Sequence, residues 1–294
     1  MIFGIGSNLK INTMILSGKE LSNKLRTEYA KEVEHIQKRY GRVPHLAVIL
    51  VGDNPASQSY VKGKSKACAE VGIKNTTIVL SEDISEAELL DNIHKLNADI
   101  DVDGILVQLP LPKHINQQRV MECIAPEKDV DGFHPVNVDG LYTGKECIKP
   151  CTPNGIIKLL EYANIDVAGK NAVVIGRSNI VGLPVAKMLL DKNATVTICH
   201  SQTKDLAKIT SEADILVVAI GKPKFITADI IKPGAVVIDV GVNRVDGKLV
   251  GDVDFDNVEY KVKAITPVPG GVGPMTITCL MENTIECFLK QHMN

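Results

Sequence analysis

Residues 171–184 constrain the fold more than any other segment; they read Asn-Ala-Val-Val-Ile-Gly-Arg-Ser-Asn-Ile-Val-Gly-Leu-Pro. The apolar run 172–175 is typical of a parallel strand that is buried on both faces. Gly176 permits a tight turn after that strand, and Gly182 and Pro184 suit the first turn of a helix. Because the free backbone N–H groups at a helix start attract anions, the segment predicts a phosphate-binding turn.

The turn departs from the dinucleotide fingerprint G-x-G-x-x-G, because Ser178 stands where the second glycine would be. An ordinary strand-to-helix turn therefore stays open as an alternative when this segment is taken alone.

The next apolar run, residues 195–199, is predicted to be the second strand of a βαβ unit. NAD-binding folds place an acidic residue at the end of that strand, but residues 200–203 contain none. Ser201 offers a hydroxyl there, and Arg177 in the turn offers a guanidinium group that suits a phosphate. We therefore expect NADP rather than NAD as the cofactor.

Length and charge limit the classes of protein to which the chain can belong. Its 294 residues suffice for two domains, and a formal net charge of -2 argues against a nucleic-acid or anionic-membrane partner. No apolar run approaches the roughly twenty residues that a membrane span requires. We therefore expect small-molecule partners, no nucleic acid and no membrane.

Cysteine and histidine usage indicates a reduced, metal-free protein. The seven cysteines include no C-x-x-C pair, and the seven histidines show no metal-ligand spacing. The segment before Met14 has neither a basic start nor a clean apolar core, unlike a signal peptide. These features predict a cytoplasmic protein without a metal site.

Hydrophobic periodicity predicts alternating helices and strands in the first half of the chain. Helical spacing runs from Ser17 to Gly41, and a capping box at Ser85 and Glu88 opens another helix to about Asn97. The remaining predictions are strands at 45–51, 74–80 and 104–109, a loop at 52–57 and a helix at 58–71. Residues 125–153, rich in Asp, Gly and Pro, are predicted to be a functional loop leading to the connection between domains.

The second half repeats the alternation, with strands near residues 172, 195, 215 and 236 and a helical tail from Pro274 to about His292. The fold class is therefore α/β: two α/β domains with mostly parallel sheets, the second of Rossmann type, and a cleft between them. We expect residues 14–150 and 275–294 in the first domain and 151–274 in the second.

Tyr60 and Lys64 lie four residues apart on a predicted helix, so they share one face near the carboxyl edge of the first sheet. An aromatic ring beside an amine could stack a flat heterocycle and move a proton next to it. Because Lys62 and Lys66 make this helix generally basic, a solvated charged face stays open as an alternative. A short-chain dehydrogenase is excluded, since its Tyr-x-x-x-Lys pair follows the dinucleotide turn within one domain.

Two other segments are predicted to reach the same edge. Gln108 ends an otherwise apolar strand, so its amide must find a partner or a ligand. Asp129 and Asp131 follow in the loop, where one carboxylate could accept two N–H donors from an amino-heterocycle. Turn capping is the alternative for either aspartate.

Five segments, in the same order, resemble the bifunctional methylenetetrahydrofolate dehydrogenase/cyclohydrolase family of the FolD type: residues 52–64, 104–112, 128–135, 176–182 and 267–276. The resemblance covers nearly everything from about Met14 onward. The thirteen residues before Met14 have no counterpart in this family.

The resemblance implies roles for individual residues. Tyr60 stacks on the pterin ring, Lys64 transfers protons and Gln108 tunes that lysine. Asp131 holds the amino edge of the pterin, and the folate pocket is lined by Pro269, Gly270 and Gly271. The NADP site is implied to involve Gly176, Arg177, Ser178, Ser201 and Val242.

The implied activity is oxidation of 5,10-methylenetetrahydrofolate by NADP⁺, followed by hydrolysis of the methenyl product to 10-formyltetrahydrofolate. Lys64 is the ionisable side chain in these motifs suited to act as a base beside a cation. The partners are tetrahydrofolate one-carbon derivatives and, by resemblance, a second copy in a homodimer through the cofactor domains. Three alternatives stay open: a monofunctional methylenetetrahydrofolate dehydrogenase, a two-domain dehydrogenase of the shikimate or amino-acid type, and a non-enzymatic NADP-binding regulator.

Overall fold

The structure, a computed structural model, describes residues 12–292. They form two compact units, which we name after a residue in each. The Lys64 unit contains residues 19–155 and 274–292, and the Gly176 unit contains residues 12–18 and 156–273. Of the thirteen residues without a counterpart in the family, the first eleven lie outside the described residues.

The Lys64 unit is built on three parallel strands in the order β3-β2-β4. Those strands are β2 (His45–Val51), β3 (Lys74–Leu80) and β4 (Gly104–Val107). Its helices are α1 (Gly18–Tyr40), α2 (Pro55–Val71), α3 (Glu86–Ala98), α4 (Gln117–Cys123), α5 (Pro135–Thr143) and, from residue 274 on, α10 (Val272–His292). A 3₁₀ turn at Pro126–Lys128 precedes α5.

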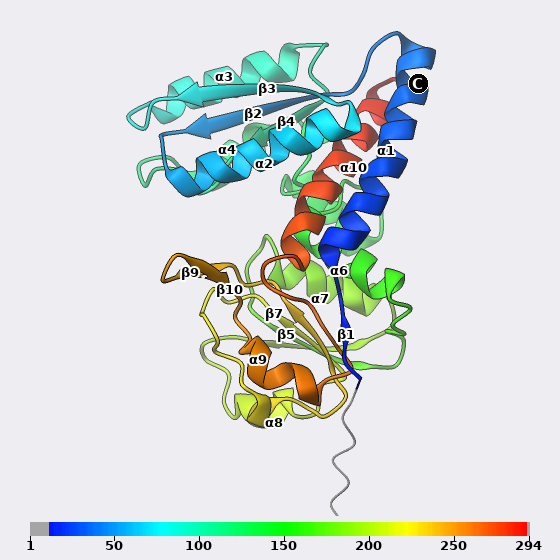
Figure 1. The fold of residues 1–294 in the computed structure, drawn as a ribbon. Coiled ribbons are helices and arrows are strands. Elements are labelled where there is room, and N and C mark those ends of the chain that lie inside the picture. Colours follow the sequence, from blue (N-terminus) through cyan, green and yellow to red (C-terminus); the bar gives the residue numbers. More distant parts are fainter. Residues whose placement is uncertain (1–11, 293–294) are drawn as a thin grey trace, which may run out of the picture. The chain divides into compact units, whose positions relative to one another are not determined.

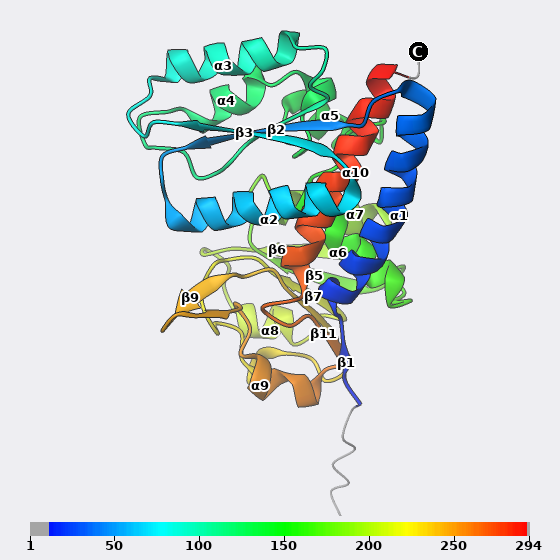
Figure 2. The ribbon, with the colours of Figure 1, turned by 45° about the horizontal axis from the view of Figure 1, so that its top comes forward.

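Helices cover both faces of this sheet, which explains why β2 is buried along its whole length. Figure 2 shows α2 on one face and α3 and α4 on the other. Leu46 and Val48 belong to the core with α2 and α10, while Ala47 and Ile49 belong to the core with α3 and α4. Alternate residues of one strand therefore enter different cores, as the period of two requires.

The last helix of the chain packs in the Lys64 unit beside the first, as both ribbon views show (Figures 1 and 2). The Ser22 and Thr278 hydroxyls join α1 to α10 at 2.7 Å. The Asn283 amide donates to the Val130 carbonyl oxygen at 2.8 Å. The helical tail predicted from the sequence thus ties the loop at residue 130 to the first helix.

The Gly176 unit is built on a six-stranded parallel sheet in the order β1-β11-β8-β7-β5-β6. Its strands are β1 (Met14–Ile15), β5 (Asn171–Ile175), β6 (Thr195–Cys199), β7 (Ile215–Val218), β8 (Val236–Asp239) and β11 (Ala264–Ile265). An antiparallel pair, β9 (Asn243–Val245) and β10 (Lys248–Val250), follows β8 in the chain. Its helices are α7 (Gly182–Asp191), α8 (Leu206–Thr210), α9 (Phe255–Val258) and most of α6 (Cys151–Tyr162).

The strand order reverses at β5, because β6 pairs on one side of it and β7 on the other. In open parallel sheets, ligands bind beyond the carboxyl ends of the strands at such a reversal. The turn that follows β5 is the turn at Gly176. The fold therefore places the predicted phosphate-binding turn where a dinucleotide fold binds its ligand.

The α/β class and the parallel sheets are confirmed, and local details differ from the sequence predictions. Helix α2 begins three residues earlier than predicted, because Asn54 caps it and Pro55 occupies its first turn. Residues 125–153 are not all loop, since α5 forms there with His134 as its cap. Met14 and Ile15, which we expected in the first domain, pair with β11 in the Gly176 unit. Residues 151–155, which we expected in the second domain, belong to the Lys64 unit.

Helix α3 offers a test of local stability, because its predicted capping box is present. Ser85 Oγ accepts from the Glu88 N–H at 3.2 Å, and the Glu88 carboxylate accepts from the Ser85 N–H at 3.0 Å. We expect Ser85→Ala to cost about 1 kcal/mol of stability and to lower the unfolding midpoint by about 2–4 °C. Calorimetry checks this shift against Ser59→Ala, an exposed helical serine expected to leave the midpoint unchanged.

Candidate functional site

Tyr60 and Lys64 lie on α2, which begins just beyond the carboxyl end of β2. The Asn54 side chain starts this helix by accepting hydrogen bonds from the N–H groups of Ala56 and Ser57 at 2.9 and 3.2 Å. The Tyr60 side chain is 48% exposed, and Lys64 is half-buried. An aromatic ring thus stays open to solvent one helical turn before a partly covered amine.

Gln108 is the partner of Lys64. The Lys64 Nζ donates to Gln108 Oε1 at 3.0 Å, and Gln108 Nε2 donates to the Leu109 carbonyl oxygen at 2.7 Å. The Gln108 backbone N–H continues the sheet by donating to the Ile49 carbonyl oxygen at 2.8 Å. The amide is buried and held at both ends, so its oxygen fixes the position of the ammonium.

Asp129 has the turn-capping role that the sequence left open. Its Oδ2 accepts from the His134 N–H at 2.8 Å and from the Asn137 amide at 2.9 Å. The carboxylate is almost fully buried among these donors. Asp129 therefore holds the loop together and has little capacity left for a ligand.

Asp131 differs from Asp129, because its carboxylate accepts no hydrogen bond from any residue that the structure describes. Burial raises the pKa of Asp131 to about 6, with the charge of Asp129 acting in the same direction and that of Lys64 in the opposite one. An ionisable group with free acceptors and a shifted pKa is typical of a binding site. The structure thus brings Lys64, Gln108 and Asp131 together.

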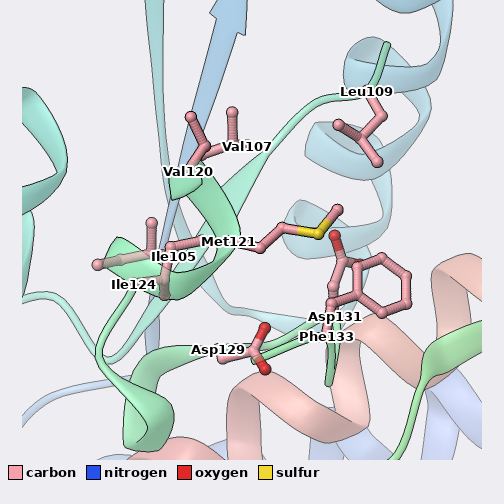
Figure 3. Close-up of a pocket in the computed structure, with 9 residues that line it drawn as sticks. All are labelled: Ile105, Val107, Leu109, Val120, Met121, Ile124, Asp129, Asp131 and Phe133. Carbon is pink, nitrogen blue, oxygen red and sulfur yellow. The ribbon is translucent and has the colours of Figure 1, made fainter. Parts of the chain in front are cut away.

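A small cavity beside these carboxylates shows how the loop packs (Figure 3). Its volume of about 10 Å³ has room for about one water molecule. The lining comes from β4, α4 and the loop: Ile105, Val107, Leu109, Val120, Met121, Ile124, Asp129, Asp131 and Phe133. The Met121 side chain extends toward Asp131 and Phe133. This space is too small for a ligand larger than water. It is therefore a packing gap between β4, α4 and the loop.

Lys128 is a residue of this motif whose role the sequence did not predict. It is buried, and its ammonium donates to three carbonyl oxygens at the end of α3, those of Leu96, Asn97 and Asp99, at 2.7–3.2 Å. Lysine near a helix end satisfies carbonyl groups that have no partner within the helix. Lys128 and Asp129 therefore anchor the loop that presents Asp131.

The turn at Gly176 requires glycine at two places. Gly176 has φ +126°, and a Cβ there would lie 2.4 Å from the Ala219 carbonyl oxygen. A Cβ on Gly182 would lie 2.3 Å from the Gly176 carbonyl oxygen. Strand, turn and helix start are thus packed backbone against backbone, which only glycine permits at these two positions.

Ser178 and Arg177 have distinct positions in this turn. Ser178 Oγ caps α7 by accepting from the N–H groups of Val181 and Gly182 at 3.2 and 3.3 Å. Arg177 is exposed, and its guanidinium group forms no ion pair within the described part of the chain. It is available to bind an anion, and these features fit a phosphate-bearing cofactor.

Ser201 and Val242 are exposed at the same carboxyl edge of the Gly176 unit. Ser201 lies in a turn closed by the His200 N–H, which donates to Thr203 Oγ1 at 2.8 Å. Val242 follows β8 and is 45% exposed. Both residues therefore lie at strand ends, where a nucleotide would bind.

Pro269, Gly270 and Gly271 form a tight turn in the Gly176 unit, after β11. Gly270 has φ +106°, and a Cβ on Gly271 would lie 2.5 Å from the Pro267 carbonyl oxygen. The residues implied for the folate pocket are thus divided between the two units.

None of the seven cysteines, all of which lie in the described part of the chain, forms a disulfide. Within residues 12–292, no three His, Cys, Asp or Glu side chains gather closely enough to hold a metal ion. No helix in that range is both long and apolar enough to cross a membrane.

Asp131 offers a test of the cost of an unpaired carboxylate. Because its pKa is raised from 3.8 to about 6, the folded protein retains a proton that the unfolded chain has lost between these pH values. The contribution of this group to stability therefore falls as the pH rises through that window. We expect Asp131→Asn to unfold at a higher temperature than the wild type at pH 7, with the difference vanishing near pH 4.

Thermal unfolding measured from pH 4 to 7 checks this prediction. Asp53→Asn, which removes an exposed carboxylate, is the control and should show no such trend. A lower midpoint for Asp131→Asn at pH 7 would contradict the prediction.

Comparisons with known proteins agree over most of the chain. Residues 16–131 match the family model of the tetrahydrofolate dehydrogenase/cyclohydrolase catalytic domain, and residues 150–292 match that of its NAD(P)-binding domain. The bifunctional protein FolD of Sulfurihydrogenibium sp. (strain YO3AOP1) is 58% identical over 280 residues, which are 95% of this chain and 98% of that protein.

Solved structures agree with these matches. The bifunctional enzyme FolD from Campylobacter jejuni superposes with a TM-score of 0.92 at 53% identity, covering 94% of this chain and 98% of that one. The Trypanosoma brucei enzyme in complex with NADP cofactor and inhibitor has a TM-score of 0.91 at 39% identity, covering 95% of this chain and 98% of that one. The chain belongs to the tetrahydrofolate dehydrogenase/cyclohydrolase family.

Proposed function

We propose that the chain is a bifunctional enzyme, which oxidises 5,10-methylenetetrahydrofolate with NADP⁺ and hydrolyses the resulting 5,10-methenyltetrahydrofolate to 10-formyltetrahydrofolate. The observation that carries this proposal is the hydrogen bond of 3.0 Å between Lys64 Nζ and Gln108 Oε1. It holds an amine beside the unpaired Asp131 carboxylate, in the unit that matches the family's catalytic domain. A monofunctional dehydrogenase would have no need of this amine.

The folate would bind beside α2 in the Lys64 unit. The exposed ring of Tyr60 suits stacking on the pterin, and the Asp131 carboxylate has the free acceptors that an amino-heterocycle needs. Pro269, Gly270 and Gly271 are the further residues that we assign to the folate pocket.

NADP would bind at the carboxyl edge of the Gly176 unit, and the residues present fit it. The pyrophosphate would bind at the turn between Gly176 and Gly182, where the N-terminal N–H groups of α7 begin. Arg177, Ser178 and Ser201 would bind the phosphates, including the 2′-phosphate. Val242 would contact the rest of the dinucleotide. When bound, NADP⁺ supplies a hydride acceptor.

The oxidation requires little acid or base chemistry from the protein. The lone pairs of the folate nitrogens stabilise the carbon from which hydride departs, so no side chain has to remove a proton. What the chain supplies is position, through Tyr60 and Asp131 on the folate. The residues that we assign in the Gly176 unit therefore bind ligands and transfer no proton.

The hydrolysis requires proton transfer. Water adds to the methenyl carbon and loses a proton, and the ring then opens as the departing nitrogen gains one. Lys64 in its neutral form accepts the first proton and in its charged form delivers the second. Gln108 holds that amine in place for both steps.

We further propose a cytoplasmic homodimer. Seven cysteines without a disulfide suit a reducing compartment. Strand β6 lies at the edge of its sheet with Ile198 38% exposed, so it offers unpaired backbone groups to a second copy.

Replacing Lys64 tests the function and its assignment together. Wild-type protein given methylenetetrahydrofolate and NADP⁺ should form NADPH and should not accumulate the methenyl chromophore, when the two signals are followed separately. We expect Lys64→Met to slow ring opening about 10²–10⁴-fold while NADPH still forms.

Lys62→Met is the matched control, because Lys62 is exposed on the same helix. Ring opening at the wild-type rate in Lys64→Met would refute the assignment of Lys64. Absence of NADPH formation by the wild type would refute the function.

Replacing Arg177 tests the cofactor preference. We expect Arg177→Ala to raise the KM for NADP⁺ about tenfold or more and to leave the KM for NAD⁺ nearly unchanged, since only NADP⁺ carries the 2′-phosphate. Steady-state kinetics with both cofactors measures this, with Arg244→Ala in the exposed β9–β10 hairpin as the control. An unchanged preference would remove Arg177 from the phosphate site.

A further inference from the structure

Two buried aspartates, Asp239 and Asp252, lie at the end of β8 and in the segment that follows it in the Gly176 unit. Asp239 ends that strand and is 3% exposed, and Asp252 follows β10 and is fully buried. Among the described residues, neither carboxylate forms an ion pair with a lysine or arginine. Both carboxylates are therefore held by N–H donors alone.

Asp239 fixes the segment that carries Asp252. Its Oδ1 accepts from the N–H groups of Gly241 and Asp252 at 3.0 and 2.9 Å, and its Oδ2 accepts from the Val253 N–H at 2.9 Å. Burial raises the pKa of Asp239 to about 6, and the charge of Asp252 acts in the same direction. The two carboxylates are thus close enough to interact.

Asp252 in turn fixes two loops at the carboxyl edge of the sheet. Its Oδ2 accepts from the N–H groups of Ile220 and Gly221, which follow β7, at 2.8 and 2.9 Å. Its Oδ1 accepts from the Asn243 side-chain amide at 2.9 Å. One side chain therefore joins the loop after β7 to the loop after β8.

Two glycines make room for these carboxylates. A Cβ on Gly241 would lie 2.2 Å from Asp252 Oδ1, and a Cβ on Gly251 would lie 1.8 Å from Asp239 Oδ2. Neither glycine has a positive φ, so close approach rather than backbone conformation requires them. The backbone is thus shaped around the two aspartates.

The loops that Asp252 joins reach the proposed cofactor residues. Val242 lies between Gly241, which is bonded to Asp239, and Asn243, which is bonded to Asp252. The loop after β7 begins at Ala219, whose carbonyl oxygen excludes any side chain from position 176. Asp252 therefore fixes the position of the exposed Val242. It also fixes the loop after β7, which packs against the phosphate-binding turn.

Holding surface loops with buried charges is a costly arrangement for the fold alone, since each carboxylate loses its hydration without gaining a cation. Such an arrangement is expected where the geometry of a binding site has to be fixed in advance. We propose that Asp252, supported by Asp239, is a positioning residue for the dinucleotide, acting through the loops at Gly221 and Val242. This inference rests on the proposed NADP site.

The test compares Asp252→Ala with Asp252→Asn. Asparagine keeps one oxygen for the N–H groups of Ile220 and Gly221, and Asn243 can turn its amide to accept from the new NH₂ group. We expect the dissociation constant of NADPH, measured by fluorescence titration, to rise about tenfold or more in Asp252→Ala and to rise less than about threefold in Asp252→Asn.

Hydrolysis of methenyltetrahydrofolate without any cofactor is measured on the same samples, and it should stay within about twofold of the wild-type rate, since Lys64 and Gln108 belong to the other unit. Asp256→Asn, an exposed carboxylate nearby in sequence, is the control and should change neither readout. If Asp252→Ala does not fold, NADPH binding is measured in Asn243→Ala instead. We expect this variant to bind NADPH more weakly than the wild type.

Three results would overturn the proposal: Asp252→Ala binding NADPH as tightly as the wild type, Asp252→Asn losing as much affinity as Asp252→Ala, or hydrolysis failing together with binding. Failure of the wild type to bind NADPH would instead refute the proposed NADP site itself.

Discussion

The burial of parallel strands on both faces is the constraint from which the rest of this structure follows. Strands β2, β4, β7 and β8 are buried throughout, and each backbone group is satisfied only by its neighbour in the sheet. Polar side chains are therefore found at the ends of the strands. Gln108 after β4 and Asp239 at the end of β8 are such groups, one in each unit.

The four buried or half-buried aspartates at these edges have different roles because their partners differ. Asp129, Asp239 and Asp252 each accept from several N–H groups of their own unit, and so they hold loops in place. Asp131 accepts none within the described residues, and its pKa is raised to about 6. An unpaired carboxylate costs stability, so its place beside Lys64 suits ligand binding rather than folding.

Local sequence predicted most elements well, because they depend on neighbouring residues. The capping box at Ser85 and the turn at Gly176 both formed where expected. Helix α5 was missed, since its short sequence has little amphipathic pattern and its start depends on His134 and Pro135. Lys128 was also missed, because its three carbonyl partners at the end of α3 are about thirty residues away.

The sequence by itself determined the α/β class, the strand-turn-helix at Gly176 and the motifs that identify the family, since each is written in residues that are adjacent or regularly spaced. Only the tertiary structure decided which aspartate is free, which oxygen faces Lys64, and that Asp252 joins two loops. The physical reason is that a carboxylate or an amide acquires its role from the donors around it, and folding brings those donors from distant parts of the chain.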